Sequence, residues 1–390
     1  MSSCRSPIAP GPLEVLLKLG NAQMQTDGYQ SEEVHRWFQQ ARDAALALDQ
    51  QDEAAEAGIR MSQFLHGNCR HRDVLEIGNG ILRGQTDRLR PETLVHVWLT
   101  MGATSYSVGD FRSALVCSQR AMELDGEANC THRAPWGGAD PAIVSRDCVE
   151  MASRVLGHLD RSSSVSKECL AIAMDRGHPF SIVWASVCRV VALAGFGLYA
   201  EAVACADHAI AICEKHGFNT RIGNVLYHRG PSLFELGDEE GGLADLQRGT
   251  AQWRERNGIF FLARNLTKLA EYQLRANQLE QARVNLGEAE HLAQTTEEKD
   301  HIAEIIRVRG RAWQAEGHHK QARICFERAI ERSREQGARL FELYAAQDLA
   351  RLSTETGDGS EALQTLRSIV EWFPAALDVP VLAECRALLG

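Results

Sequence analysis

A turn residue recurs every 40 positions through the second half of the chain. Positions 157, 197, 237, 277, 317 and 357 hold five glycines and one asparagine. These two residue types best tolerate the left-handed backbone that ends an α-helix. A second series lies halfway between them, at Gly177, Gly217, Asn257 and Gly337, and is broken at Glu297. Turns every 20 positions predict repeated pairs of helices of roughly 15 to 18 residues each.

Between the turns, apolar residues follow the spacing of an amphipathic helix. The segment QARICFERAIERSREQ carries charged residues on one side and an apolar stripe on the other. The stripe consists of Ala322, Ile324, Cys325, Ala329 and Ile330. No segment alternates with period two for long enough to predict a sheet, so the fold class is all-α.

Each unit also follows the tetratricopeptide pattern of large and small residues. A large residue is followed after four positions by Gly or Ala, then by a turn Gly and by two further small residues. The best copies are Trp98, Gly102, Gly109, Ala114 and Ala121, and then Ile306, Gly310, Gly317, Ala322 and Ala329. Because helices approach closely only where one presents a small residue, we expect Ala322 and Ala329 to be buried. The sequence predicts a tetratricopeptide-like right-handed superhelical solenoid of about nine helix pairs with a 40-residue period.

The repeats are interrupted once. The interval from Gly109 to Gly157 exceeds the 40-residue period by eight residues, and it contains Pro135 and Pro141, which argue against a continuous helix. The predicted organisation is a disordered segment at 1–12, N-terminal repeats at 13–124, a Pro/Gly-rich loop at 125–142, C-terminal repeats at 143–375 and a capping helix at 376–390. Pro380 suits the first turn of that last helix.

Charge, apolar runs and cysteine spacing argue against nucleic-acid binding, a membrane span and a disulfide framework. The chain has 42 Lys and Arg against 52 Asp and Glu, a formal net charge of −10, and lacks the basic field that nucleic-acid binding usually needs. No apolar run approaches the roughly 20 residues of a membrane span. The 11 cysteines are scattered without a CxxC pair, as in a reducing compartment. We therefore expect a cytoplasmic protein with no nucleic-acid or membrane partner.

The familiar motifs of catalysis and cofactor binding are absent from the sequence. There is no GxxxxGK[ST] phosphate loop and no GxSxG elbow, and EIGNGILRG misses the GxGxxG spacing. The segment HGNCRH brings His66, Cys69 and His71 together, but it shows no fourth ligand and follows no common zinc pattern. The sequence predicts no enzyme activity, no cofactor and no metal site.

The inner surface of such a superhelix, lined by the first helix of each pair, is the expected place for a partner. The candidate partner-binding residues there are Tyr227, His228, Arg264, Lys268, Arg307, Arg311 and Arg351. The five cations form a basic ladder that could receive a carboxylate-rich or acidic peptide, although a charged groove is also typical of an ordinary solvated face. Exposed arginines such as Arg307 and Arg311 are expected to contribute little to stability.

The loop at 125–142 is the second candidate site, because irregular loops on rigid scaffolds often carry binding residues. Its candidates are His132, Trp136 and Asp140. Asp140 is also placed to cap the helix that follows. If loop and ladder serve one surface, the loop folds over the concave side.

The sequence resembles the C-terminal tetratricopeptide region of large bacterial signalling proteins, in which a class III adenylate/guanylate cyclase or a winged-helix domain is joined to an AAA-type ATPase. The resemblance is carried by GYQSEEV (28–34), GATSYSVGDFRSA (102–114), HRAPWGGADPAIV (132–144) and GHPFS (177–181), and by the closing stretch. It implies a non-catalytic scaffold or regulatory sensor arm, whether the chain stands alone or is truncated from such a fusion.

Three functions are open at this stage: a protein-interaction scaffold, a receptor for a peptide or small ligand whose superhelix tightens on binding, and an enzyme with an unrecognised site. The partner in the first two is a protein or peptide held in the concave groove. The shape of the groove separates them, because an open channel favours a protein and an occluded pocket favours a small ligand. The oligomeric state is not predicted.

Overall fold

The computed structural model describes residues 16, 17, 19, 31–84, 86–128, 139–357 and 359–390, and within these ranges it contains helices and no strand. The all-α prediction is confirmed. The predicted disordered segment at 1–12 lies outside the described residues. The α-helices are α2 (Glu32–Ala47), α3 (Gln51–Gly67), α4 (His71–Arg83), α5 (Pro91–Ser107), α6 (Phe111–Ala128), α7 (Pro141–Val155), α8 (Leu159–Arg176), α9 (Pro179–Gly195), α10 (Tyr199–His216), α11 (Asn219–Glu235), α12 (Glu239–Asn257), α13 (Leu262–Arg275), α14 (Leu279–Thr295), α15 (Ile302–Ala315), α16 (His319–Gln336), α17 (Arg339–Thr356), α18 (Ser360–Val370) and α19 (Pro380–Leu389).

The helix ends follow the predicted turns. From α9 to α17, each first helix of a pair ends within three residues of its Gly or Asn in the 40-residue series, at Gly195, Glu235, Arg275, Ala315 and Thr356. At Gly317 the backbone has a φ of 77°, and at Asn277 it has a φ of 59°. These left-handed residues let the chain reverse direction at once, so the second helix packs back on the first.

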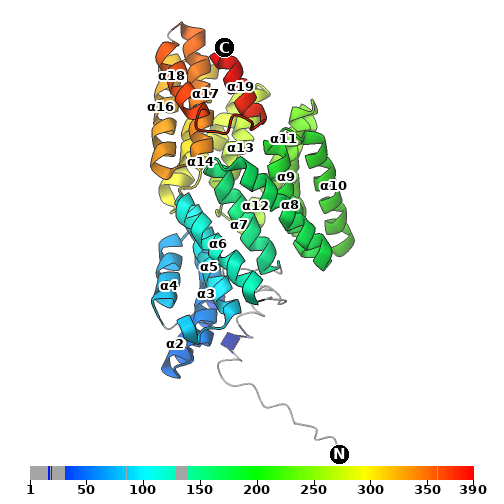
Figure 1. Cartoon of the computed structure of the whole chain (residues 1–390), viewed down its shortest axis with the longest axis vertical. Helices are drawn as coiled ribbons and strands as arrows, with labels where there is room; N and C mark the ends of the chain where they lie inside the picture. Colours follow the sequence, from blue (N-terminus) through cyan, green and yellow to red (C-terminus); the bar gives the residue numbers. More distant parts are fainter. Residues whose placement is uncertain (1–15, 18, 20–30, 85, 129–138, 358) are drawn as a thin grey trace, which may run out of the picture.

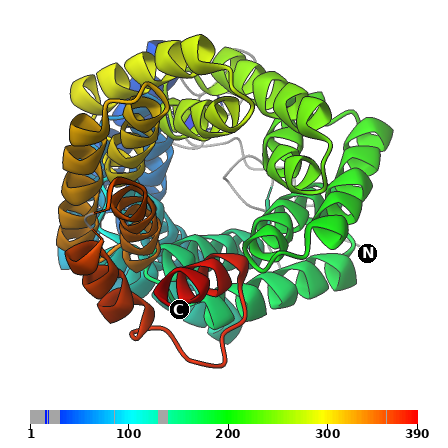
Figure 2. The same cartoon turned by 90° about the horizontal axis from the view of Figure 1, so that it is seen from above.

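Neighbouring helices stack in pairs to form two layers. In the described part of the chain there are eight such pairs, from α3 with α4 to α17 with α18, and α2 and α19 flank them. The ninth predicted pair has its turn near Gly28; this turn and most of the first helix lie outside the described residues, and α2 follows the turn in the place of the second helix. Seen from above, the pairs form a ring of helices (Figure 2). Within the described ranges, no helix combines the length and the apolar character needed for a membrane span.

Small residues allow the close helix contacts. Ala322 and Ala329 are fully buried, as predicted. A Cβ atom on Gly310 would lie 2.6 Å from the Phe326 ring, and one on Gly242 would lie 2.6 Å from a backbone oxygen of α11. A larger side chain at either position would force the two helices of the pair apart.

The superhelix is right-handed and closes on itself, so that helices far apart in the sequence lie side by side (Figures 1 and 2). The Lys299 backbone N–H donates to the Ser107 carbonyl over 2.7 Å. The Phe111 and Phe341 rings meet edge to face with centroids 6.3 Å apart. α17 also contacts α7. These contacts join the repeats of α15 to α17 to those of α5 to α7, one superhelical turn earlier, and surround the space between them.

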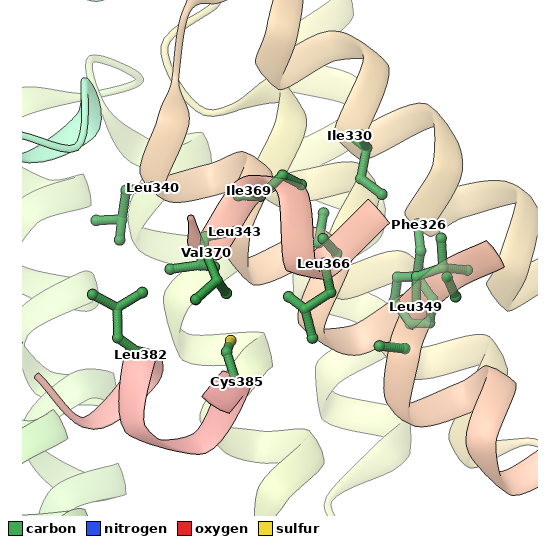
Figure 3. Packing of buried hydrophobic residues seen from close by; sticks show 14 of the residues in the cluster. Phe326, Ile330, Leu340, Leu343, Leu349, Leu366, Ile369, Val370, Leu382 and Cys385 are labelled. Atoms are coloured by element: carbon green, nitrogen blue, oxygen red, sulfur yellow. The ribbon is translucent and has the colours of Figure 1, made fainter. Parts of the chain in front are cut away.

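The largest apolar cluster lies at the C-terminal end, where α16, α17, α18 and α19 meet (Figure 3). Phe326, Leu343, Leu366 and Leu382 are fully buried in it. α19 begins at Pro380. Proline suits the first turn of a helix because it has no N–H group, and the N–H groups of that turn have no partner within the helix. This short helix covers the last face of the stack, as a capping repeat must.

The predicted loop at 125–142 is shorter in the structure. Its first four residues continue α6 to Ala128, and α7 begins at Pro141. Gly126 lies within this helix, and the first proline of the predicted loop comes only at Pro135, so nothing in 125–128 excludes helix.

Candidate functional site

The closed superhelix contains a cavity of about 580 Å³. Its walls come from the first helices of the pairs, α5 through α17, together with Tyr199 and with Pro380, Val381 and Glu384 at the C-terminal end. All seven candidates that the sequence placed on the concave surface line this cavity: Tyr227, His228, Arg264, Lys268, Arg307, Arg311 and Arg351. The repeat frame therefore brings together side chains that lie far apart in the sequence.

The loop candidates do not join them in the described residues. His132 and Trp136 lie outside those residues. Asp140 is not part of the cavity wall: its carboxylate accepts a hydrogen bond from the Ala142 N–H over 2.9 Å and pairs with Arg176. The predicted helix cap is confirmed, and the carboxylate is held at the start of α7.

Arg307 is buried, with 4% of its surface exposed, and the expectation of an exposed arginine is wrong. Its guanidinium contacts Glu304 one turn earlier over 2.8 Å. It also contacts Asp348 over 2.8 Å and Glu271 over 2.5 Å. The two latter acids lie 41 and 36 positions away, about one repeat in each direction, so the solenoid stacks them beside Arg307. Three carboxylates surround one cation at the centre of the wall.

The other cations are also largely neutralised. Lys268 and Arg311 both contact Glu271, over 3.2 and 3.4 Å, and Arg351 contacts Glu384 over 2.6 Å. Burial opposes the charged form of Glu271, but Arg307 and the neighbouring cations hold its pKa well below the usual value. The expected basic ladder is in fact a mixed-charge wall, because each repeat supplies acids as well as bases.

Arg264 is the exception. Among the described residues, it is the one cation of the cavity wall with no ion pair, and its guanidinium lies 4.0 Å from the centre of the Phe261 ring. Burial first, and the Arg264 charge second, lower the pKa of His228 to about 3, and they lower the pKa of His301 well below its usual value. At neutral pH both imidazoles are uncharged. Burial raises the pKa of the nearby Asp300 carboxyl to about 7, and the Arg264 charge opposes that rise. Because no carboxylate of the described residues pairs with it directly, Arg264 offers its positive charge to a ligand.

Tyrosine is concentrated at the same site. Five of the six tyrosines in the chain line the cavity: Tyr106, Tyr199, Tyr227, Tyr272 and Tyr344. Burial raises the pKa of Tyr106 to about 12, so its hydroxyl stays protonated. A tyrosine combines a rigid apolar ring with a hydroxyl that can donate or accept a hydrogen bond. Only Tyr227 is among the candidates that the sequence predicts, although four of the five tyrosines lie on inner helices of the repeat pairs.

Pro231 adds a backbone group to the wall. It lies inside α11 and lines the cavity. Because proline has no N–H, the Tyr227 carbonyl four residues earlier lacks its helical donor. The cavity thus combines hydroxyls, neutral imidazoles, paired charges, one unpaired guanidinium and a backbone acceptor, which together suit a ligand with several amide groups and a negative charge.

The sequence matches no family model and no curated protein at a significant level. Solved structures do resemble it. A Rap protein complexed with competence and sporulation factor has a TM-score of 0.65 and 13% identity, covering 96% of this chain and 99% of that chain. NprR in complex with its cognate peptide NprX has a TM-score of 0.63 and 11% identity, covering 92% and 97%. The apo form of the quorum sensor NprR from B. thuringiensis has a TM-score of 0.53 with the same identity and coverage. At these identities the likeness establishes the fold, a tetratricopeptide-like helical solenoid.

Proposed function

We propose that this chain is a non-catalytic regulatory protein whose central cavity binds a short peptide. The observation that carries the proposal is the central cavity of about 580 Å³ lined by five tyrosines and by Arg264, which has no ion pair among the described residues. Its volume falls within the roughly 300 to 1,000 Å³ of typical ligand sites and is too small for a folded protein partner. Tyrosine hydroxyls suit the amide groups of a peptide, and a guanidinium suits a carboxylate.

The small volume of the cavity favours the receptor alternative over a folded protein bound in the groove. Rap and NprR were solved with a bound factor and a bound peptide, and the present chain is more similar to peptide-bound NprR than to apo NprR. This supports a ring that closes around a small ligand. The proposed ligand contacts are Tyr227, His228, Arg264, Lys268, Arg311 and Arg351, and Arg307 holds the wall behind them.

The proposed output is an interaction with a larger signalling protein. We propose that the chain acts as a sensor arm for a bacterial signalling ATPase, cyclase or transcription regulator, and the support is the resemblance of its repeats to those fusion proteins. The loop residues His132, Trp136 and Asp140 are the proposed contacts with that partner, because they lie where the repeat is interrupted.

Affinity selection from a pool of randomised short synthetic peptides tests the cavity. Immobilised wild-type chain should retain a defined subset, identified by mass spectrometry, and Arg264→Ala should lose peptides with a free or side-chain carboxylate. The matched control is Arg328→Ala, an exposed arginine on α16 outside the cavity wall. If wild type and Arg264→Ala retain the same peptides while both are folded, the cavity is not the binding site.

A further inference from the structure

The segment HGNCRH, at the turn between α3 and α4, has an unusual backbone for its sequence. Cys69 lies one 40-residue period before Gly109, and its φ is 55°, in the left-handed region. Most equivalent turns of the solenoid place Gly there, and one places Asn. A residue with a Cβ is sterically unfavourable in this conformation, so the local fold gives no reason for cysteine at this position.

A third polar side chain reaches this turn from a distant part of the sequence. Glu298 lies between α14 and α15, where the superhelix closes, and its two carboxylate oxygens accept the Phe261 N–H over 2.9 and 3.1 Å. The Cys69 Sγ, one ring nitrogen of His71 and one oxygen of Glu298 all lie within 4.8 Å of one another. All three residues are buried, with 3%, 0% and 4% of their surfaces exposed.

The unpartnered ring nitrogens of His71 are a second, independent indication of a ligand site. It is fully buried, yet neither of its ring nitrogens has a hydrogen-bond partner among the described residues. Its Nε2 lies 3.8 Å from the Glu298 carboxylate, too far for a hydrogen bond. Buried imidazole nitrogens are almost always satisfied, so an unpartnered imidazole at 0% exposure points to a group that the site can bind through one of these nitrogens.

His66 is not available to complete the set. It contacts the Thr104 hydroxyl over 3.2 Å and the Ser107 hydroxyl over 3.5 Å, and its ring meets that of His71 edge to face at 4.8 Å. Its neighbours therefore fix it in place as part of the wall around the site.

A second cluster of similar composition shows what a satisfied group looks like. Asp147, Glu150 and Cys188 also lie within 4.8 Å of one another. Asp147 accepts from the Trp184 indole N–H over 2.8 Å, and Glu150 accepts from Arg154. These carboxylates have donors from the protein itself, as Glu298 has, but this cluster has no unpartnered imidazole like His71 and so gives no sign of a bound cation.

We propose that Cys69, His71 and Glu298 bind a zinc ion, with a water molecule in the fourth position. A thiolate, an imidazole and a carboxylate are the three ligand types that zinc prefers in proteins. Zinc-ligand bonds of about 2.0 to 2.3 Å place tetrahedral donor atoms roughly 3.5 Å apart, which small side-chain rotations reach from the observed spacing. Binding releases the thiol proton of Cys69 to solvent, forms a sulfur–zinc bond and gives one ring nitrogen of His71 a partner.

The ion would stabilise the contact between the α3–α4 turn and the segment between α14 and α15. Beside the site, the Arg72 N–H donates to a Glu297 oxygen over 2.7 Å, and these two residues are 225 positions apart in the sequence. An ion bound by Cys69, His71 and Glu298 would link the same two parts of the chain. The proposal stands independently of peptide binding, because none of the three ligands lines the central cavity.

The test uses the full chain, freed of metal by dialysis against a chelator and then titrated with Zn²⁺ in competition with a chromophoric chelator. We expect one zinc ion per chain. Cys69→Ser, His71→Gln and Glu298→Gln should each weaken binding by more than about 100-fold, because even outer-shell partners of a metal ligand cost 10- to 100-fold. Cys188→Ser, in the satisfied cluster, is the matched control and should bind zinc as the wild type does.

Cobalt substitution gives a readout that does not depend on a variant folding. Co²⁺ added to the wild-type chain should produce a thiolate-to-cobalt charge-transfer band, and the Cys188→Ser variant should show the same band. Absence of stoichiometric zinc and of this band in the wild type would overturn the proposal. So would a folded Cys69→Ser chain, checked by circular dichroism, that binds Zn²⁺ as tightly as the wild type.

Discussion

Arg307 and Arg264 lie on neighbouring inner helices, α15 and α13, and line the same cavity, yet their surroundings are opposite. Arg307 is buried among Glu271, Glu304 and Asp348, whereas Arg264 lies over the Phe261 ring without an ion pair among the described residues. The repeat position determines that a side chain points inward. Its role then depends on the residues at the equivalent positions of the neighbouring repeats. Where they are acids, the side chain forms ion pairs that stabilise the fold, and where they are not, it can bind a ligand.

The largest expected effect is on stability at Arg307. Arg307→Ala removes the one cation that three buried carboxylates share, and breaking a buried pair of this kind costs about 3 to 5 kcal/mol. Chemical denaturation should show a lower midpoint with an unchanged slope. Arg311→Ala is the control on the same helix: it has one contact, at 3.4 Å, and should cost about 1 kcal/mol or less. Equal costs for the two variants would remove the distinction between structural and free arginines.

Helix packing provides the next effect in size. Ala322 is fully buried on α16, which packs against α15. Ala322→Leu adds volume to a well-packed contact and should cost about 1 to 3 kcal/mol in unfolding free energy. Ala322→Gly, measured in parallel, separates overpacking from loss of helix propensity, which is about 1 kcal/mol. If Ala322→Leu costs more than Arg307→Ala, packing rather than the ion network holds this wall.

The smaller effect on stability belongs to Arg264. Its aromatic contact contributes on the order of 0.5 to 1 kcal/mol, so Arg264→Ala should lower the unfolding free energy by about 1 kcal/mol or less. Binding of a selected peptide should fall by at least about tenfold, because a hydrogen bond to a charged group contributes about 1.5 to 3 kcal/mol. Isothermal calorimetry measures this, and Arg264→Lys, which keeps the charge, should recover part of the loss. A strong loss of stability would make Arg264 a second structural arginine.

The fold could be predicted from the sequence because its signals are local. A left-handed turn needs Gly or Asn, as at Gly317 and Asn277, and a close crossing needs a small residue such as Ala322. The same period placed the inner residues correctly. The same 40-residue period could also have predicted the ion pairs of Arg307, since Glu271 and Asp348 lie 36 and 41 positions from it.

The closure of the ring could not be predicted in this way. The approach of Glu298 to Cys69 and His71 depends on the summed rotation of the intervening repeats, which no single repeat encodes. For the same reason the sequence could not show that the inner helices surround one central cavity of about 580 Å³. The unpaired state of Arg264 likewise depends on which acids the neighbouring helices do not supply.

The last prediction concerns proton binding, where the effect is smallest. Burial, and then the Arg264 charge, lower the pKa of His228 from 6.5 to about 3. Arg264→Ala should raise that pKa, because the imidazolium loses a repulsive neighbour. The unfolded chain takes up the proton at a higher pH than the folded chain does, so His228 costs stability as the pH falls from about 6.5 towards 3, and the variant should lose less over that range. A ¹H–¹³C NMR titration of the His228 ring, assigned with His228→Gln, measures the shift. An unchanged pKa would mean that burial and the other cations, Arg154 first among them, keep His228 neutral. The Arg264 charge would then be balanced by other groups of the cavity wall, as that of Arg307 is.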